Sequence, residues 1–549
     1  MRYKKILLII FPLTFFAVGF LTLNNYGINW DEPVHYIRGQ AFLRFFMTGK
    51  KDYSGLPGIE YSDNLNSRRS IYQFDSKGTN YLSFNEFVTN PGSHPPLNGI
   101  IASFFNYIFY QQLGILGDID SYHLFVLAVS SLLVFLVFFF TREEYGLFAG
   151  IISFLSLSLY PLFFGESHFN IKDPVEASFY GWTIYSFYKG IVGKSSRWII
   201  TSSIFAGLAL GTKFNIFFAF VTILFWMIIL KWKELRSFKW PFSKRLTTSL
   251  AAYPFIVFII FFISYPNLWQ DPIRELSYVF SYYKEIGYGI VYQPSSYITF
   301  FGLNTYPIQA VFYTTPLITL LLSSIGVLWA LTKGFHEKNK TALIIFLWFI
   351  IPIVRVSFPN MGIYGGVRQI MEYIPAMAML SGIGGYYIVR QFSNLTIKQF
   401  IKIVILILFI PITLKIISVH PNENVYLNPL IGGLKGAREK GFPDWGVTLG
   451  SPYKQGVDWM NAHAEKNARL TLVKGLLQNI PPNALRRDIL FGDIYYSGAS
   501  KKGEYLMEVN DYRFESDVLS EKREYIKTLH PAYEIKVDDV PILIIWKNE

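Results

Sequence analysis

The chain has 549 residues, of which 52% are hydrophobic, 18% aromatic and only 16% charged. A soluble protein carries about 25% charged residues, whereas this chain contains repeated apolar runs long enough to cross roughly 30 Å of hydrocarbon. We therefore predict a polytopic membrane protein. The net charge of +12 fits the basic excess of cytoplasmic loops and argues against nucleic-acid binding, because the basic residues lie between apolar runs. The absence of cysteine excludes disulfides, thiolate metal sites and cysteine nucleophiles.

Twelve apolar runs in the first 419 residues are the candidate membrane spans. They lie at roughly 5–24, 97–113, 122–140, 146–165, 174–191, 197–212, 214–231, 247–266, 308–332, 341–358, 369–389 and 399–419. The first run begins like a signal peptide, but it is long for one and no small-residue cleavage site precedes Asn24. We therefore expect a retained first span.

The distribution of basic residues predicts the topology. Arg2, Lys4 and Lys5 place the N-terminus in the cytoplasm, and the basic cluster at 231–245 is expected on the same side. If all twelve runs crossed, the cluster at 231–245 would lie outside, so its cytoplasmic location requires that one earlier run does not cross. The run 97–113 is short and interrupted by polar residues, so we predict a helix that lies at the outer interface or is only partly inserted. About eleven crossings remain, with the long loops and the C-terminus outside.

Residues 420–549 differ in composition from the transmembrane domain that we assign to residues 1–419. They carry many charges, and their alternating apolar segments favour a small α/β domain outside the membrane. Strands are expected at 468–473, 504–509, 533–537 and 541–546, and a helix at 454–466. The stretch 420–455 is rich in Gly, Pro, Asn and aromatic residues, and we expect it to fold back over an external cavity.

Three polar residues stand directly before proline on the predicted outer side: Glu32, His94 and Asp173. Proline suits the first turn of a helix, and an acid before it caps the helix and meets the positive end of its dipole. Asp31, Glu32 and Asp173 are therefore either helix caps or members of a functional site. Their location on one face under a topology built only from charge and parity favours the second interpretation.

Further polar residues belong to the same face. The segment "ESHFNIKD" (166–173), predicted as a very short turn, has charged, amide or histidine side chains at five of its eight positions, including His168. Such groups at a bilayer boundary are costly unless paired or solvated. Lys213 and Arg368 lie at outer ends of spans, where each either snorkels to the interface or binds an anion.

Arg355 and Glu372 lie deeper in apolar sequence, where mutual pairing is one interpretation. The carboxylates and cations of the outer face suit the attack of a hydroxyl or amine on a carbon that bears a phosphate leaving group. A carboxylate would accept the proton, and cations would stabilise the departing phosphate. Because nucleotide sugars are absent outside a bacterial inner membrane, the donor there would be an activated lipid.

An ordered set of motifs then indicates a family: "WDEPVHY", "HPPL", "FNIKDPVEASF", "GLALGTKF" and "RQIMEYIPAMAML". The chain resembles the GT-C membrane glycosyltransferases, and more closely the bacterial branch related to protein O-mannosyltransferases (glycosyltransferase family 39) and the lipid A aminoarabinose transferase. The resemblance covers most of residues 1–420. It implies a mainly α, polytopic GT-C fold in the bacterial cytoplasmic membrane.

The resemblance also implies site residues and a reaction. The catalytic carboxylate maps to Asp31, with Glu32 beside it and Asp173 as a second acid. His94, His168, Lys213, Arg368 and Tyr36 are the candidates for binding the substrate or the donor phosphate. The implied reaction moves a sugar from a polyprenyl-phosphate donor to a protein, lipid or glycan by an inverting displacement, with Asp31 as general base.

Two other functional classes and a metal site fit parts of the sequence. A transporter or flippase of lipid-linked saccharides should show inverted repeats and broken helices at the midplane, and a non-catalytic scaffold would leave the acids before proline unexplained. Asp31, Glu32, Asp173 and His94 could together hold Mg²⁺ or Mn²⁺. The sequence has no cluster of metal-ligand spacing, and we expect no obligatory metal.

Overall fold

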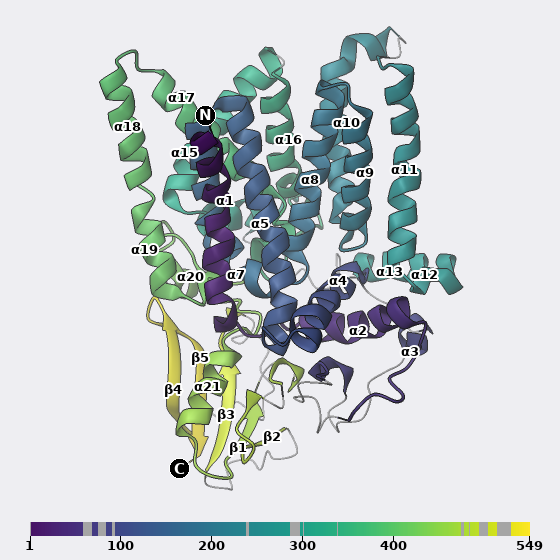
Figure 1. The fold of residues 1–549 in the computed structure, drawn as a ribbon. Coiled ribbons are helices and arrows are strands. Elements are labelled where there is room, and N and C mark those ends of the chain that lie inside the picture. Colours follow the sequence, from purple (N-terminus) through teal and green to yellow (C-terminus); the bar gives the residue numbers. More distant parts are fainter. Residues whose placement is uncertain are drawn as a thin grey trace.

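The structure is a computed structural model that describes most of the chain (Figure 1). The described residues are 2–58, 68–74, 84–89, 94–237, 241–285, 297–299, 301–337, 339–473, 477–481, 484–492, 503–512 and 529–548. The side chains of Arg2, Lys4 and Lys5 and residues 238–240 of the basic cluster lie outside this part, so the orientation in the membrane stays a prediction.

Most of the chain forms a bundle of roughly parallel helices (Figure 1). These are α1 (Arg2–Thr22), α5 (Asp118–Tyr145), α8 (Asp173–Val192), α9 (Ser196–Leu210), α10 (Phe217–Arg236), α11 (Lys244–Ser264), α15 (Leu317–Leu331), α16 (Lys340–Arg355), α17 (Tyr373–Arg390), α18 (Leu395–Ile407) and α19 (Ile410–Val419). Two further helices, α6 (Leu147–Ser158) and α7 (Pro161–Phe169), form a pair bent by 62°. All twelve apolar runs coincide with a helix or with two successive helical segments.

Length and apolar composition make the bundle a membrane structure. Among the described residues, five helical stretches are long and apolar enough to cross a membrane, and the bent pair makes up to six. The central helix α5 has 72% of its most apolar window buried, against 22% for α11 and for α18–α19. An apolar surface that the protein does not cover must face hydrocarbon. The chain is therefore a multi-pass membrane protein, while the exact number of crossings stays a prediction.

The run 97–113 forms only a short α-helix, and its place at the outer interface stays a prediction. Its α-helical part, α4 (Leu97–Asn106), has ten residues, which at 1.5 Å per residue covers about half of the hydrocarbon thickness. It continues as a π-helical turn over Tyr107–Gln112. Figure 1 shows α4 beside α2 (Glu32–Thr48), at the end of the bundle that carries the strands. Three short helices lie near them in Figure 1: α3 (Phe84–Thr89), α12 (Asn267–Gln270) and α13 (Pro272–Glu285). Another short helix, α14 (Tyr306–Thr314), contacts the turn Gly366–Ile370.

The C-terminal part forms a five-stranded mixed sheet in the order β2-β1-β3-β5-β4. The strands are β1 (Arg469–Leu472), β2 (Leu490–Phe491), β3 (Glu504–Val509), β4 (His530–Val537) and β5 (Val540–Asn548). β1 pairs in parallel with β2 and β3, and β5 pairs antiparallel with β3 and β4. Helix α21 (Tyr453–His463) packs against β3 and β5. The four predicted strands and the helix are thus confirmed; the short β2 and α20 (Gly433–Glu439) were not predicted.

The turn between β4 and β5 consists of Asp538 and Asp539, with φ angles of 49° and 63°. Positive φ at both central residues is the mark of a tight two-residue hairpin, and Asp tolerates this conformation. The turn approaches α19, because the Lys415 ammonium donates a hydrogen bond to the Asp538 carboxylate. The sheet is therefore tied to the end of the bundle at this point, while the division of the chain at residue 419 stays a prediction.

Candidate functional site

Segments far apart in the sequence meet near the end of the bundle where α2 begins. The first is the turn that carries Asp31. Asp31 precedes α2 but makes no capping hydrogen bond; instead, Lys172 Nζ donates to its Oδ2 at 2.7 Å. The Asp31 side chain is 40% exposed, whereas that of Lys172 is 8% exposed. Asp31 therefore stands at the cap position without a capping hydrogen bond, and its partly exposed carboxylate is paired with Lys172 instead.

Asp173 forms the second centre of the cluster. It is the first residue of α8 and makes no capping bond either, since Lys172 occupies the cap position. Lys213 Nζ donates to its Oδ1 at 2.7 Å, and Arg368 Nη1 donates to its Oδ2 at 3.1 Å. The Asp173 side chain is only 1% exposed. A buried carboxylate is tolerable only when paired, and here two cations from different segments converge on it.

Two asparagines set up the turns that present these acids. Asn170 Oδ1 accepts hydrogen bonds from the backbone N–H of Lys172 at 3.0 Å and of Asp173 at 3.1 Å. Asn29 Oδ1 accepts from the backbone N–H of Asp31 at 3.0 Å. Both are Asx turns, in which a side chain fixes the backbone two or three residues ahead. The sequence therefore builds the same local device before α2 and before α8.

Electrostatics keep Asp31 ionised. Partial burial raises the pKa of the Asp31 carboxyl, but the charges of Lys172 and Arg368 and the hydrogen bond from Lys172 outweigh it and hold the pKa well below its usual range. A group with a depressed pKa contributes stability above its unfolded pKa and loses it only as pH falls through the folded value. The carboxylate is thus charged at neutral and mildly acidic pH.

His94 borders this cluster. Its Nδ1 lies 2.8 Å from Tyr283 Oη, and its ring centroid lies 6.1 Å from that of His35. Burial lowers the pKa of His94, and the neighbouring Lys172 and His35 lower it further, against the opposing effect of Asp31. The imidazole is therefore neutral at neutral pH. The backbone carbonyl of His94 accepts a hydrogen bond of 2.8 Å from Arg38 Nη2.

Glu32 and Tyr36, both predicted site residues, are not brought to the cluster. Glu32 is fully buried; its Oε1 accepts from Tyr36 Oη at 2.7 Å and its Oε2 from the Asn29 N–H at 2.8 Å. His123 Nε2 lies 3.2 Å from the same Oε2. Adjacent helical residues point about 100° apart, so Glu32 turns toward α5 while Asp31 faces the cluster. Glu32 and Tyr36 therefore brace α2 against α5.

His168 also lies elsewhere, because α7 runs on to Phe169 and leaves only three residues before α8. The His168 ring is buried and stacks on Tyr26 with centroids 4.2 Å apart, and its Nε2 lies 3.2 Å from Thr22 Oγ1. Residues two apart on a helix lie on nearly opposite faces. Glu166 accordingly accepts a hydrogen bond from Asn170 beside Asp173, and His168 faces α1.

Lys172 and Asn170 are the site residues that sequence reasoning missed. Both lie within the polar segment 166–173 that the sequence indicates, but neither is among the predicted site residues. Arg355 and Glu372 pair with each other, as one interpretation of the sequence predicted: Arg355 Nη2 donates to Glu372 Oε1 at 2.7 Å.

Within the described part of the chain, no three His, Cys, Asp or Glu side chains group as metal ligands. Asp31, Glu32, Asp173 and His94 therefore do not assemble into a divalent-cation site there.

The stretch 420–455 covers the turn that carries Asp31. The Trp30 N–H donates to Leu449 O at 3.0 Å, and the Gly27 N–H donates to Ser451 Oγ at 3.2 Å. From beyond α21, Asn479 Nδ2 donates to Asn29 O at 3.0 Å. A small cavity of about 40 Å³ lies between this stretch and the cluster, and its lining includes Glu166, Gly365–Val367, Asn424–Leu427 and Phe442–Asp444.

Comparison with known proteins gives a family similarity over part of the chain and a fold. Residues 93–261 match the family model described as dolichyl-phosphate-mannose-protein mannosyltransferase. No curated protein matches the chain. Among solved structures, ArnT from Cupriavidus metallidurans bound to undecaprenyl phosphate aligns with a TM-score of 0.51 at 13% identity, over 99% of this chain and 98% of ArnT.

Two other alignments have lower scores. ArnT in the apo state gives 0.48 at 12% identity, over 100% of this chain and 98% of ArnT. The Archaeoglobus fulgidus oligosaccharyltransferase AglB, in complex with an inhibitory peptide and a dolichol-phosphate, gives 0.47 at 11% identity, over 93% of this chain and 70% of AglB. The fold assignment rests on the first alignment: the chain is a multi-pass membrane protein with the fold of ArnT, and its residues 93–261 are similar to the mannosyltransferase family model.

Proposed function

We propose that this protein transfers a sugar from a polyprenyl-phosphate donor to an acceptor on the extracytoplasmic side of a bacterial cytoplasmic membrane. The observation that carries the proposal is the partly exposed, ionised Asp31 carboxylate, 2.7 Å from Lys172 and close to the cations on Asp173. A proton acceptor beside several cations suits a reaction that deprotonates an acceptor and expels a phosphate.

The chemistry is a single displacement. The acceptor hydroxyl or amine gives its proton to Asp31 while its oxygen or nitrogen attacks the anomeric carbon of the donor. The bond from that carbon to the phosphate oxygen breaks, and the polyprenyl phosphate leaves with the electron pair. One base on one side of the ring corresponds to inversion at the anomeric carbon.

Arg368 is the residue best suited to hold the donor phosphate. Its Nη1 is bonded to Asp173, but its Nε is buried and has no partner among the described residues. An unmet buried donor of this kind is costly unless a ligand satisfies it. Gly365 lies against this edge of the guanidinium and leaves the space that a side chain would fill. Arginine presents planar N–H groups that match phosphate oxygens, and Lys213 adds a second charge nearby.

Lys172 gives the site a way to adjust the base. While it is paired with Lys172, the Asp31 carboxyl has a depressed pKa and is a weak proton acceptor, because a general base works best when its pKa is near the working pH. A phosphate that arrives beside the cluster offers Lys172 a second anionic partner. Loosening the pair then raises the pKa of Asp31 at the moment the donor is bound.

The proposal is tested in cells that contain or lack the gene, by mass spectrometry of their glycans, glycoproteins and glycolipids. The expected result is a product that differs by one sugar and appears only with the gene. Expression of the wild-type protein restores it, and expression of Asp31→Asn does not. Identical profiles in the two strains under conditions of confirmed expression would contradict glycosyl transfer.

The role of Lys172 makes a separate prediction about pH. In Lys172→Met, burial still raises the pKa of Asp31 but the strongest opposing charge is gone, so the pKa rises. The acidic limb of kcat/KM against pH should therefore move to higher pH than in the wild type. Lys189→Met, which removes a lysine paired with Glu143 at an exposed site, is the control and should leave the limb in place. Coinciding limbs for Lys172→Met and the wild type would refute this role.

A further inference from the structure

A small cavity lies where the turn between α1 and α2 meets the C-terminal part of the chain. Its volume is about 140 Å³, similar to that of an engineered cavity that takes up benzene, so it fits a ligand of about six heavy atoms. Its wall comes from the turn before α2, the start of α5, helix α21 and residues 479–481 and 484. The apolar part of the wall consists of Ile28, Ile119, Val457, Ile480 and Pro481.

The unmatched polar groups of this wall are hydrogen-bond acceptors. The Asp120 carboxylate, in the first turn of α5, makes no hydrogen bond or ion pair within the described part of the chain. Asn479 is 3% exposed, and its Nδ2 donates to Asn29 O at 3.0 Å and to Ile28 O at 3.5 Å. Its buried Oδ1 has no partner among the described residues. Because both carbonyls can only accept, the amide cannot be turned round, and Oδ1 is the atom left for a ligand.

A ligand that matches this wall supplies hydrogen-bond donors and a positive charge on a short apolar body. An ammonium group donates three hydrogen bonds and accepts none. The rings of Tyr26 and Tyr453, both 1% exposed, belong to the wall, and aromatic rings attract cations. Lys454 at the rim is already paired, since its Nζ lies 3.2 Å from Asp458. Asp120 is therefore the uncompensated charge of the described wall, and an alkylammonium group balances it.

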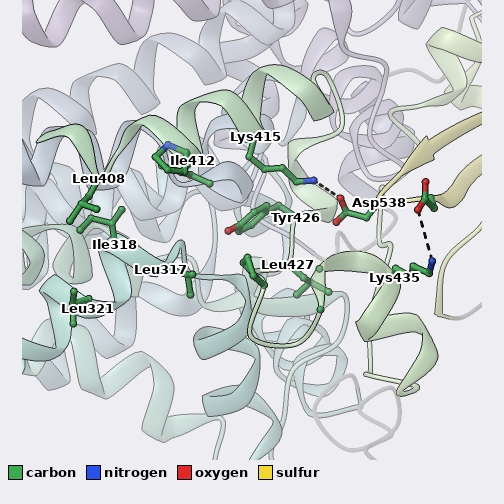
Figure 2. Close-up of a pocket in the computed structure, with 15 residues that line it drawn as sticks. Leu317, Ile318, Leu321, Leu408, Ile412, Lys415, Tyr426, Leu427, Lys435 and Asp538 are labelled. Carbon is green, nitrogen blue, oxygen red and sulfur yellow. Dashed lines mark hydrogen bonds and ion pairs between the residues drawn. The ribbon is translucent and has the colours of Figure 1, made fainter. Parts of the chain in front are cut away.

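The larger groove between α15 and the helices α18 and α19, of about 780 Å³, has no such imbalance. Figure 2 shows two ion pairs at one end of it, where Lys415 is bonded to Asp538 and Lys435 Nζ lies 3.9 Å from Asp539. Each lysine of that groove has an acidic partner. The charge and the acceptors that lack a partner are those of the cavity beside Asn479.

Hydrogen bonds connect the cavity to the candidate site. Asn479 Nδ2 donates to Asn29 O, and Asn29 Oδ1 accepts from the Asp31 N–H at 3.0 Å. A ligand bonded to Asn479 Oδ1 fixes this amide and, through Asn29, the turn that presents the Asp31 carboxylate. The ligand itself lies away from the reacting atoms, so it acts as an effector and not as a reactant.

We propose that this cavity binds an alkylammonium group, held by the Asp120 carboxylate and Asn479 Oδ1, and that its occupation steadies the turn that carries Asp31. The binding does not rest on the proposed function, whereas the effect on sugar transfer does. Free amines and lysine side chains both carry this group, and separate probes distinguish the two sources.

Binding is measured by saturation-transfer NMR on the purified full-length protein in phosphatidylcholine nanodiscs, with n-butylammonium as the probe. Butanol and butyrate have the same apolar body without the cation, and each should bind at least about tenfold more weakly, the equivalent of one lost charged hydrogen bond. Asp120→Asn should weaken n-butylammonium binding by a similar factor. Ala484→Trp, which fills the cavity from its exposed rim, should abolish it.

The source of the ammonium group is tested with acetyl-lysine methylamide, which presents it as a protein does. Binding as tight as that of n-butylammonium would assign the cavity to a lysine side chain of a protein. Weaker binding than that of n-butylammonium would assign it to a free amine.

Two variants are matched controls. Asp539→Asn removes a carboxylate that is 86% exposed and lies outside the cavity, and asparagine tolerates the positive φ of this position. Ala532→Trp adds the same indole at an exposed position of β4 that does not line the cavity. Both should bind n-butylammonium like the wild type. Equal binding by Asp120→Asn and Asp539→Asn, or equal binding of n-butylammonium and butanol by the wild type, would overturn the site.

The effect on transfer is a separate readout, made with the sugar donor that the cell comparison identifies. Saturating n-butylammonium should raise kcat of the wild type about fivefold, at the lower end of usual allosteric effects. It should not raise that of Asp120→Asn, whose basal rate should equal that of the wild type. An unchanged kcat in the wild type, with binding confirmed, would overturn the link to Asp31 while the site stands. Absence of any sugar transfer by the wild type would instead refute the proposed function, and the NMR measurement would still decide on the site.

Discussion

Asp31→Asn should lower the rate of sugar transfer by about 10²–10⁴-fold, the usual contribution of a general base. Asparagine has nearly the same shape, and its amide oxygen can still accept the hydrogen bond from Lys172. The Lys172 side chain is only 8% exposed and loses its counter-charge, but it keeps this hydrogen bond, and the Asp31 position is 40% exposed, so the cost in stability should be small. The variant should therefore fold and bind undecaprenyl phosphate normally. The measurement is single-turnover transfer by purified protein, with the donor sugar that the cell comparison identifies.

Glu32→Gln is the control for this prediction, because Glu32 is adjacent in sequence but has a different environment. Its carboxylate is buried with Tyr36, Asn29 and His123, so the amide should lower the thermal stability of the protein rather than abolish transfer. Transfer at the wild-type rate by Asp31→Asn would exclude Asp31 as the base. Loss of transfer by a stable Glu32→Gln protein would show that the assignment of the two acids must be exchanged.

The contrast between these two acids shows what the sequence could predict. Topology from charge and parity, together with the family resemblance, pointed to one face and to Asp31, Asp173, Lys213 and Arg368, which the structure brings together through direct ion pairs or a shared cluster. These positions lie at the ends of helices, where parity alone decides the side of the membrane.

Sequence reasoning failed where the direction of a side chain was needed. Glu32, Tyr36 and His168 belong to the right segments but point to other helices, because one or two residues along a helix turn a side chain by about 100° or 200°. The role of Lys172 was not predicted for a different reason. A basic residue at a membrane boundary usually snorkels, and the Asx turn of Asn170 is what directs Lys172 to Asp31. In the C-terminal part, alternation identified four strands, whereas the two residues of β2 are too few to carry a pattern.

Asp173→Ala should be strongly destabilising, by about 3–5 kcal/mol, because it leaves partners of a buried ion pair without their counter-charge. Lys213 and Arg368 both bond to this carboxylate, and their side chains are only 11% and 10% exposed. Combining Asp173→Ala with Lys213→Met removes one orphaned cation, so the double variant should recover part of the lost stability instead of adding a second loss. Thermal unfolding of the purified proteins in the same detergent measures both effects.

The same variant separates a structural ion pair from a phosphate site. If Lys213 and Arg368 hold the donor phosphate, undecaprenyl phosphate replaces the missing carboxylate in Asp173→Ala and binds the folded form more tightly than it binds the wild type. A ligand stabilises a protein in proportion to the logarithm of its concentration over Kd, so the rise in Tm on adding undecaprenyl phosphate should be larger for Asp173→Ala than for the wild type. Glu372→Ala is the control, since it orphans Arg355 in the deeper pair, which shares the Gln369 carbonyl with Lys213 but leaves the Asp173 carboxylate in place, and its rise should be close to that of the wild type. A rise in Asp173→Ala no larger than in Glu372→Ala would mean that the two cations serve the fold alone, and the donor phosphate would then have to be held by other residues.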